Sequence, residues 1–220
     1  MKRIVIVEAE LTRLVAALKQ FAGKVCPSQD PAWSRPLAIR IVDCVLSLRR
    51  NYDRFVVPRL EALMRAHPEL HTIAQLEVLV AGYQSPSAFV ERELNYKHPD
   101  RARILASVIR FVAGLVQGVS PALQAEALER WATSARPEDF KDLNIKGFKL
   151  AGFQYLRMLF GAQTTKPDQH IIAFVSESIG RQVSDVEALV LLEAATARLN
   201  LPLRDVDTTI WESRARSASA

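Results

Sequence analysis

The amino-acid sequence predicts an all-α protein, and three observations support this prediction. The chain contains only 8 glycines in 220 residues and is rich in Ala, Leu and Arg, which favours helix. Apolar residues recur at intervals of three and four along most of the chain, as on the buried face of a helix. Ser-Pro and Ser-x-x-Glu sequences supply the caps and first-turn residues that begin helices.

The first half of the chain is expected to form several helices after a short arm. Residues 1–7 are apolar enough for a short strand or an extended arm, and residues 26–34 form a loop containing two prolines. Pro36 can open a helix because a first-turn proline sacrifices no needed N–H group. The expected helices cover residues 9–24, 36–48, 52–66, 72–83 and 86–94.

The second half is expected to be helical as well. The apolar spacing of residues 100–117 predicts a strong helix, and Ser120-Pro121 begins the next one, to residue 133. Gly180 suits the end of a helix that begins after Asp168. The sequence Ser184-x-x-Glu187 is a capping box for a helix over 185–199, and a last short helix covers 205–213.

Composition and charge restrict the class of protein. The net charge is +5 and the sequence pI is about 9.4, which is compatible with nucleic-acid binding. The two cysteines, Cys26 and Cys44, form no CxxC pair, which argues against a disulfide scaffold, a zinc site or a four-cysteine iron–sulfur cluster. No cofactor or metal is therefore expected. Without a signal peptide or an apolar run of 18 residues, we expect a cytoplasmic (bacterial nucleoid-associated) or otherwise intracellular protein.

One stretch, residues 143–174, carries the clearest motif. It contains Leu143, Gly147, Lys149 and Ala151, followed by Asp168-Gln169-His170. This order resembles the Leu-x-Gly-x-Gly-x-Lys-x-Ala and Asp-x-His pattern of the helix-hairpin-helix (HhH-GPD) DNA glycosylase superfamily. The 19-residue separation of Lys149 and Asp168 is similar to that of the 8-oxoguanine DNA glycosylase branch.

The motif departs from the family pattern at one position, because Ile145 replaces the first hairpin glycine. A register shifted by two residues places Gly147 on that first glycine and Ala151 on the catalytic lysine. The first register matches more positions and is preferred. The second register would imply a monofunctional enzyme or no catalysis at all.

The resemblance implies catalytic roles for Lys149 and Asp168. The Lys149 amine would attack the sugar C1′ as the base leaves and form a Schiff base, and the Asp168 carboxylate would stabilise the cationic sugar. The amine must be partly neutral to act, and burial near a helix N-terminus favours the neutral form. The ordinary alternatives are a solvated Lys149 and an Asp168 that only caps the following helix.

The resemblance also implies how DNA would be held. The hairpin would hold one phosphate through backbone N–H groups near Gly147, helped by Lys146. Arg49 or Asn51, at the end of an early core helix, would fill the space left by a flipped base. Further DNA contacts are expected at Lys97, His98, Arg101 and His170, and base-pocket contacts at Asp207 and Trp211. Each has an ordinary alternative as a surface, helix-end or packing residue.

Together these observations predict an N-terminal arm and helix (1–35), a glycosylase-like domain (36–212) and a disordered tail (213–220). The resemblance implies two helical layers with a cleft between them. The expected function is base-excision repair: a DNA glycosylase with AP-lyase activity, acting as a monomer on double-stranded DNA containing a damaged base. An oxidised purine is the favoured lesion, and no membrane partner is expected. Two alternatives stay open: a non-catalytic DNA-binding protein on the same scaffold, and a helical interaction protein unrelated to DNA.

Overall fold

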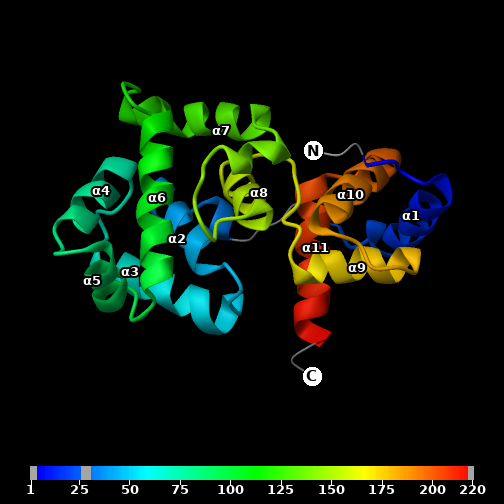
Figure 1. Ribbon diagram of the computed structural model, residues 1–220, viewed down its shortest axis with the longest axis horizontal. Helices are drawn as coiled ribbons and strands as arrows, with labels where there is room; N and C mark the ends of the chain where they lie inside the picture. The colour runs from blue at the N-terminus through cyan, green and yellow to red at the C-terminus, as the bar shows by residue number, and fades with distance from the viewer. Residues whose placement is uncertain (1–3, 26–30, 218–220) are drawn as a thin grey trace.

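The computed structural model describes residues 4–25 and 31–217, and within these ranges every regular element is a helix. The all-α prediction is therefore confirmed. The helices form two layers, shown in Figure 1, each with its own cluster of buried apolar side chains.

The first layer contains the helices from α2 to α8. Their bounds are α2 Leu37–Leu46, α3 Val57–Ala66, α4 Ile73–Ala81, α5 Pro86–Glu93, α6 Pro99–Leu115, α7 Gln124–Ser134 and α8 Leu150–Leu159. Three short helical turns lie between some of them, η2 Tyr52–Val56, η3 Pro121–Leu123 and η4 Pro137–Lys141, and a fourth, η1 Pro31–Trp33, precedes α2.

The second layer contains the first helix of the chain and the last three. Their bounds are α1 Glu8–Ala22, α9 Gln169–Ile179, α10 Asp185–Leu199 and α11 Leu203–Ser217. Helix α1 packs against α9 and α10, although it is separated from them in sequence by the whole first layer (Figure 1). The capping box of Ser184 and Glu187 and the left-handed Gly180 are found where the sequence predicts them.

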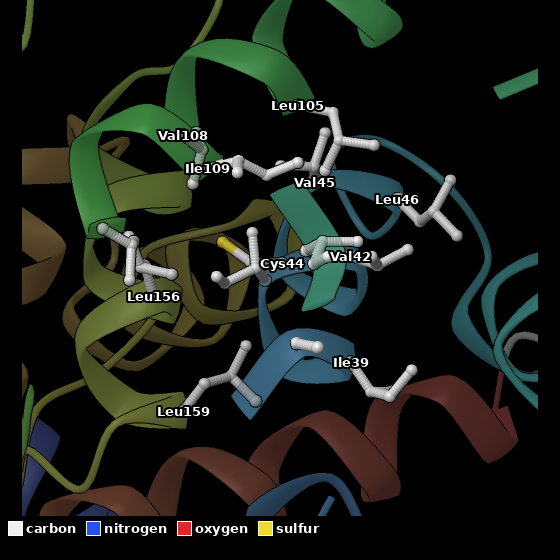
Figure 2. Packing of buried hydrophobic residues seen from close by; sticks show 14 of the residues in the cluster. Ile39, Val42, Cys44, Val45, Leu46, Leu105, Val108, Ile109, Leu156 and Leu159 are labelled. Carbon is white, nitrogen blue, oxygen red and sulfur yellow. The ribbon is translucent and has the colours of Figure 1, made fainter. Parts of the chain in front are cut away.

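Helix α2 is the centre of the first layer. Eight of its ten residues are buried, which fits its largely apolar sequence. Figure 2 shows Cys44 and Val45 of α2 packed between Leu105 and Ile109 of α6 and Leu156 of α8. The Cys44 thiol also lies 3.4 Å from the carbonyl oxygen of Gly152, so α2 and α8 approach closely at this glycine.

Several expected boundaries differ from the structure. Pro36 is the N-cap of α2 and not its first helical residue. The expected helix over 52–66 begins with a π-helical turn, because Pro58 has no N–H group to continue the regular bonding pattern. The arm residues Val5, Ile6 and Val7 are exposed and form no strand. The expected loop over 26–34 lies partly outside the described residues and ends in the turn η1.

The expected domain boundaries are also corrected. Helix α1 is part of the second layer, because Leu11, Leu14 and Leu18 are buried in its core, so no boundary falls at residue 35. The expected disordered tail is wrong for its first residues, since α11 continues to Ser217. The Arg214 guanidinium binds the Glu177 carboxylate at 2.7 and 2.9 Å, which ties this end of α11 to α9. Residues 218–220 lie outside the described residues.

Candidate DNA-binding hairpin and carboxyl pair

The residues of the predicted hairpin form a non-helical, mostly exposed turn between η4 and α8. It surrounds an open hollow of about 190 Å³. Two of its residues, Asn144 (φ +46°) and Gly147 (φ +91°), have left-handed backbone conformations. The hollow is lined by Phe140, Lys141, Asn144, Ile145, Lys146, Gly147, Phe148 and Lys149.

Of the two glycine positions in the family motif, 145 and 147, only position 147 has a backbone conformation that requires glycine. Gly147 needs to be glycine, because its φ is left-handed and an added Cβ would lie 3.0 Å from Ile104 Cδ1. Ile145 is not in the left-handed region and packs partly buried against the first-layer core. The left-handed residue in this half of the turn is Asn144, a residue type that tolerates the conformation. The turn therefore forms without the first glycine.

Positive charge gathers around the hollow. Lys141, Lys146 and Lys149 line it, and all three side chains are exposed. Lys149 is the N-cap residue of α8 and makes no side-chain cap bond. The hollow thus combines three ammonium groups with the positive end of a helix, an arrangement that favours an anion. The burial expected for the Lys149 amine is not found.

Asp168 is the N-cap of α9, as the sequence predicts. Its Oδ1 atom accepts hydrogen bonds from the backbone N–H groups of His170 at 2.9 Å and Ile171 at 3.3 Å. The residue is half-buried. Among the described residues, no hydrogen bond or ion pair joins Asp168 to Lys149, so the structure does not bring these two predicted catalytic groups into direct contact.

Asp207 lies beside Asp168 at the junction of the layers. It is 7% exposed, and its Oδ1 accepts bonds from the Thr165 hydroxyl and from the Lys166 N–H group at 2.8 Å. Burial raises the pKa of Asp207 to about 7; the Thr165 bond opposes this rise, and the Asp168 charge adds to it. Two carboxyl groups in different environments therefore meet here.

Lys166 is a neighbouring group that the sequence analysis missed. Its half-buried ammonium lies 4.1 Å from the centre of the Tyr155 ring and 3.4 Å from Ser47 Oγ. Its charge also acts on the buried carboxyl group of Asp43. The only available signal was its place two residues before Asp168, which does not distinguish it from a solvated lysine.

A buried polar cluster of the first layer lies next to Lys166. The Asp43 carboxylate accepts bonds from Arg35 at 2.5 Å, Tyr52 at 2.8 Å and Tyr155 at 3.2 Å, and burial raises its pKa. The Tyr52 ring meets the Trp211 ring edge-on, with centroids 5.9 Å apart. Trp211 therefore packs the last helix onto the first layer, the ordinary role expected for it, at the same junction as Asp207.

Arg49 and Asn51, the two residues expected to fill the space left by a flipped base, differ in their surroundings. Asn51 Oδ1 accepts a bond from the Arg54 N–H group at 2.8 Å and so caps the turn η2. Arg49 is exposed and has a left-handed φ of +55°, an uncommon conformation for a residue with a long side chain. Backbone strain of this kind is often found at functional sites, which favours Arg49 over Asn51.

The other predicted DNA contacts lie in different environments. Lys97 is exposed and lies 3.7 Å from Glu91. His98 is the N-cap of α6, and its Nδ1 accepts a bond from the Arg101 N–H group at 3.2 Å. Arg101 is only 9% exposed and donates to the Leu48 carbonyl oxygen at 2.8 Å, so its guanidinium holds the end of α2 and does not project into solvent. His170 is half-buried, and its Nε2 atom lies 3.4 Å from the side-chain nitrogen of Gln169.

Two features are absent from the described residues. None of their helices has the length and apolar character needed to span a membrane. No group of three or more His, Cys, Asp or Glu side chains in that part of the chain is arranged to hold a metal ion.

Comparison with known proteins identifies a family but no characterised relative. No curated protein and no solved structure matches the sequence. One family model, described as "Domain of unknown function (DUF8548)", matches residues 12–215. That range takes in most of α1 and nearly all of α11, so the match covers both layers. The chain therefore belongs to the DUF8548 family.

Proposed function

We propose that this chain is a DNA base-excision glycosylase of the HhH-GPD type, which binds double-stranded DNA at the hairpin and removes a flipped, damaged base. The observation that carries the proposal is the hairpin itself. A left-handed Gly147, an open basic hollow and the N-terminus of α8 occur together where the motif places a phosphate.

The order of elements also supports the proposal. Helix α8 begins at the hairpin and runs for 10 residues, about 15 Å, toward the connection that carries Lys166 and Asp168. A DNA strand held at the hairpin would thus lie within one short helix of the carboxyl pair. Removal of a damaged base requires its extrusion from the stack, which is easier for a mismatched or damaged base.

The proposed chemistry uses one amine and one carboxylate. The amine of Lys149, after it has lost a proton to solvent, attacks C1′ of the deoxyribose; the bond from C1′ to the base breaks, and the base leaves with the bonding electrons and takes up a proton. The sugar ring then opens at the C1′–O4′ bond, O4′ takes up the proton lost from the nitrogen, and the nitrogen and C1′ form the imine. The Asp168 carboxylate, fixed by its two backbone bonds, stabilises the positive charge that develops on the sugar. The resulting imine permits strand cleavage, which is the AP-lyase activity.

Borohydride trapping on a duplex containing an abasic site tests the proposal. Borohydride reduces an imine to a stable amine, so the wild type should form a covalent protein–DNA adduct and Lys149→Gln should not. Lys146→Gln is the matched control, because it removes the same charge from the same hollow and leaves the nucleophile. Undiminished trapping by Lys149→Gln would assign the amine elsewhere.

A non-catalytic DNA-binding protein is the second candidate, favoured by the exposure of the Lys149 amine. It predicts DNA binding that weakens with salt, as expected for phosphate contacts, without adduct formation or base release. Fluorescence anisotropy at several salt concentrations, run beside the trapping assay, separates the two functions. Absence of DNA binding at low salt would contradict both.

A further inference from the structure

We infer that Asp207 is the proton donor to the departing base, acting as the acid partner of the Asp168 carboxylate. This inference rests on the proposed function and adds a second catalytic group to it. It assigns the two carboxyl groups at the junction of the layers opposite protonation states and different tasks.

The position of Asp207 is fixed relative to Asp168. Its Oδ1 is bonded to the backbone N–H of Lys166, two residues before Asp168. The turn between them is tight, since the Asp168 N–H group lies 2.6 Å from the Lys166 carbonyl oxygen. The Asp168 charge also raises the pKa of Asp207, as expected for carboxyl groups on adjoining segments.

The two oxygens of Asp207 are used differently. Oδ1 accepts both hydrogen bonds, from Thr165 and Lys166. Oδ2 accepts none among the described residues, yet it is not one of the fully enclosed atoms that lack a partner there; those belong to Arg59, Arg101, Gln124 and Arg204. Oδ2 is therefore the atom that can carry a proton and present it outward.

The surroundings of the two carboxyl groups differ. Asp168 receives two backbone N–H bonds, which suit an anion. Asp207 is buried, and the nearby Asp168 charge further disfavours its ionisation, so its pKa of about 7 leaves it partly protonated at neutral pH. The Lys166 ammonium opposes this effect. In enzymes, when the surroundings push the pKa values of two carboxyl groups apart, one group commonly acts as the acid and the other as the anion.

As the bond between C1′ and the base breaks, the bonding electrons go to the base nitrogen system, and the proton on Asp207 Oδ2 moves to the departing base. Asp207 becomes a carboxylate, Asp168 stays ionised and faces the cationic sugar, and solvent later returns the proton to Asp207.

Single-turnover base release between pH 5 and pH 9 tests the inference, with a duplex containing 8-oxoguanine opposite cytosine as the probe. The wild-type rate should fall as the pH rises through about 7, because Asp207 then loses its proton. Asp207→Asn retains an oxygen for Thr165 and Lys166 but has no acid, so its rate at pH 6 should drop at least about tenfold and the alkaline fall should vanish. Asp205→Asn, a buried neighbour on α11, is the matched control and should keep the wild-type profile.

A second variant keeps the inference testable if Asp207→Asn does not fold. Thr165→Val removes the hydroxyl bond that lowers the pKa of Asp207, so the alkaline fall should move to higher pH. An unmoved fall in Thr165→Val, or an Asp207→Asn profile identical to wild type, would overturn the role of Asp207 alone. No base release by the wild type at any pH, from this or other damaged-base duplexes, would instead overturn the proposed function.

Discussion

The conformation of Gly147 gives a sharp test of the hairpin. Replacement by alanine places a Cβ in a backbone with φ +91° and 3.0 Å from Ile104 Cδ1. A residue with a Cβ costs about 1–2 kcal/mol in the left-handed region, and the Ile104 methyl group can rotate away. For a chain of this length each 1 kcal/mol corresponds to roughly 2–4 °C, so the melting temperature should fall by about 2–8 °C.

DNA affinity should fall more than this strain alone explains. Relief of the strain would rotate the hairpin N–H groups away from a bound phosphate, and a hydrogen bond to a charged group contributes about 1.5–3 kcal/mol. The dissociation constant should therefore rise by roughly tenfold or more in a fluorescence anisotropy titration of duplex DNA.

Gly180→Ala is the matched control for this experiment. Gly180 has a similar left-handed φ of +82°, ends α9, and an added Cβ there meets no atom within 4 Å. It should show a comparable loss of stability with wild-type DNA affinity. Equal affinities for Gly147→Ala and Gly180→Ala would refute the hairpin as the phosphate site.

Three further predictions concern the nucleophile, the contact between α2 and α8, and Asp207. Lys149→Gln should lose borohydride-trapped adducts while it keeps most of its DNA affinity, measured by gel electrophoresis and anisotropy. Gly152→Ala should lower the free energy of unfolding by about 1–3 kcal/mol in a denaturant titration, because its Cβ would lie 2.8 Å from Leu48 Cδ2 and 2.9 Å from Phe148 Cε2. Gly114→Ala is the control and should not lower it, since an added Cβ there meets no atom within 4 Å. The folded state holds the Asp207 proton up to a pKa of about 7, above the ordinary 3.8, so wild-type stability should fall as the pH rises between these values. Asp207→Asn should lack this fall and be more stable than wild type at pH 8, by up to about 4 kcal/mol, and identical pH dependence in the two proteins would contradict the raised pKa.

Much of the fold could be predicted because its signals are local. The capping box at Ser184, the N-cap at Asp168 and the left-handed Gly180 act within one helical turn, and the structure has each where the sequence indicates it. The place of α1 could not be predicted in this way. Its partners α9 and α10 are more than a hundred residues away, and apolar spacing shows that a face is buried but not what covers it.

The same distinction applies to the site. The hairpin residues are consecutive, so Gly147 and its lysines could be identified together. The remaining groups come from four separate segments, and packing within and between the layers brings them close together: Asp43, Tyr155, Lys166 and Asp207. The inward direction of Arg101 was likewise hidden, because its Leu48 partner is 53 residues away.

Base release by the wild type and by Asp168→Asn, measured side by side under single-turnover conditions, tests the central claim most directly. Asparagine also caps helices well, so the variant should fold, melt near the wild-type temperature and bind DNA with similar affinity. It loses only the charge that faces the cationic sugar, and base release should fall at least about a hundredfold, or about 2.7 kcal/mol. Should the asparagine variant fail to fold, Asp168→Ser provides the alternative cap. Release at the wild-type rate by a folded variant would reduce Asp168 to a helix cap and contradict the proposed chemistry.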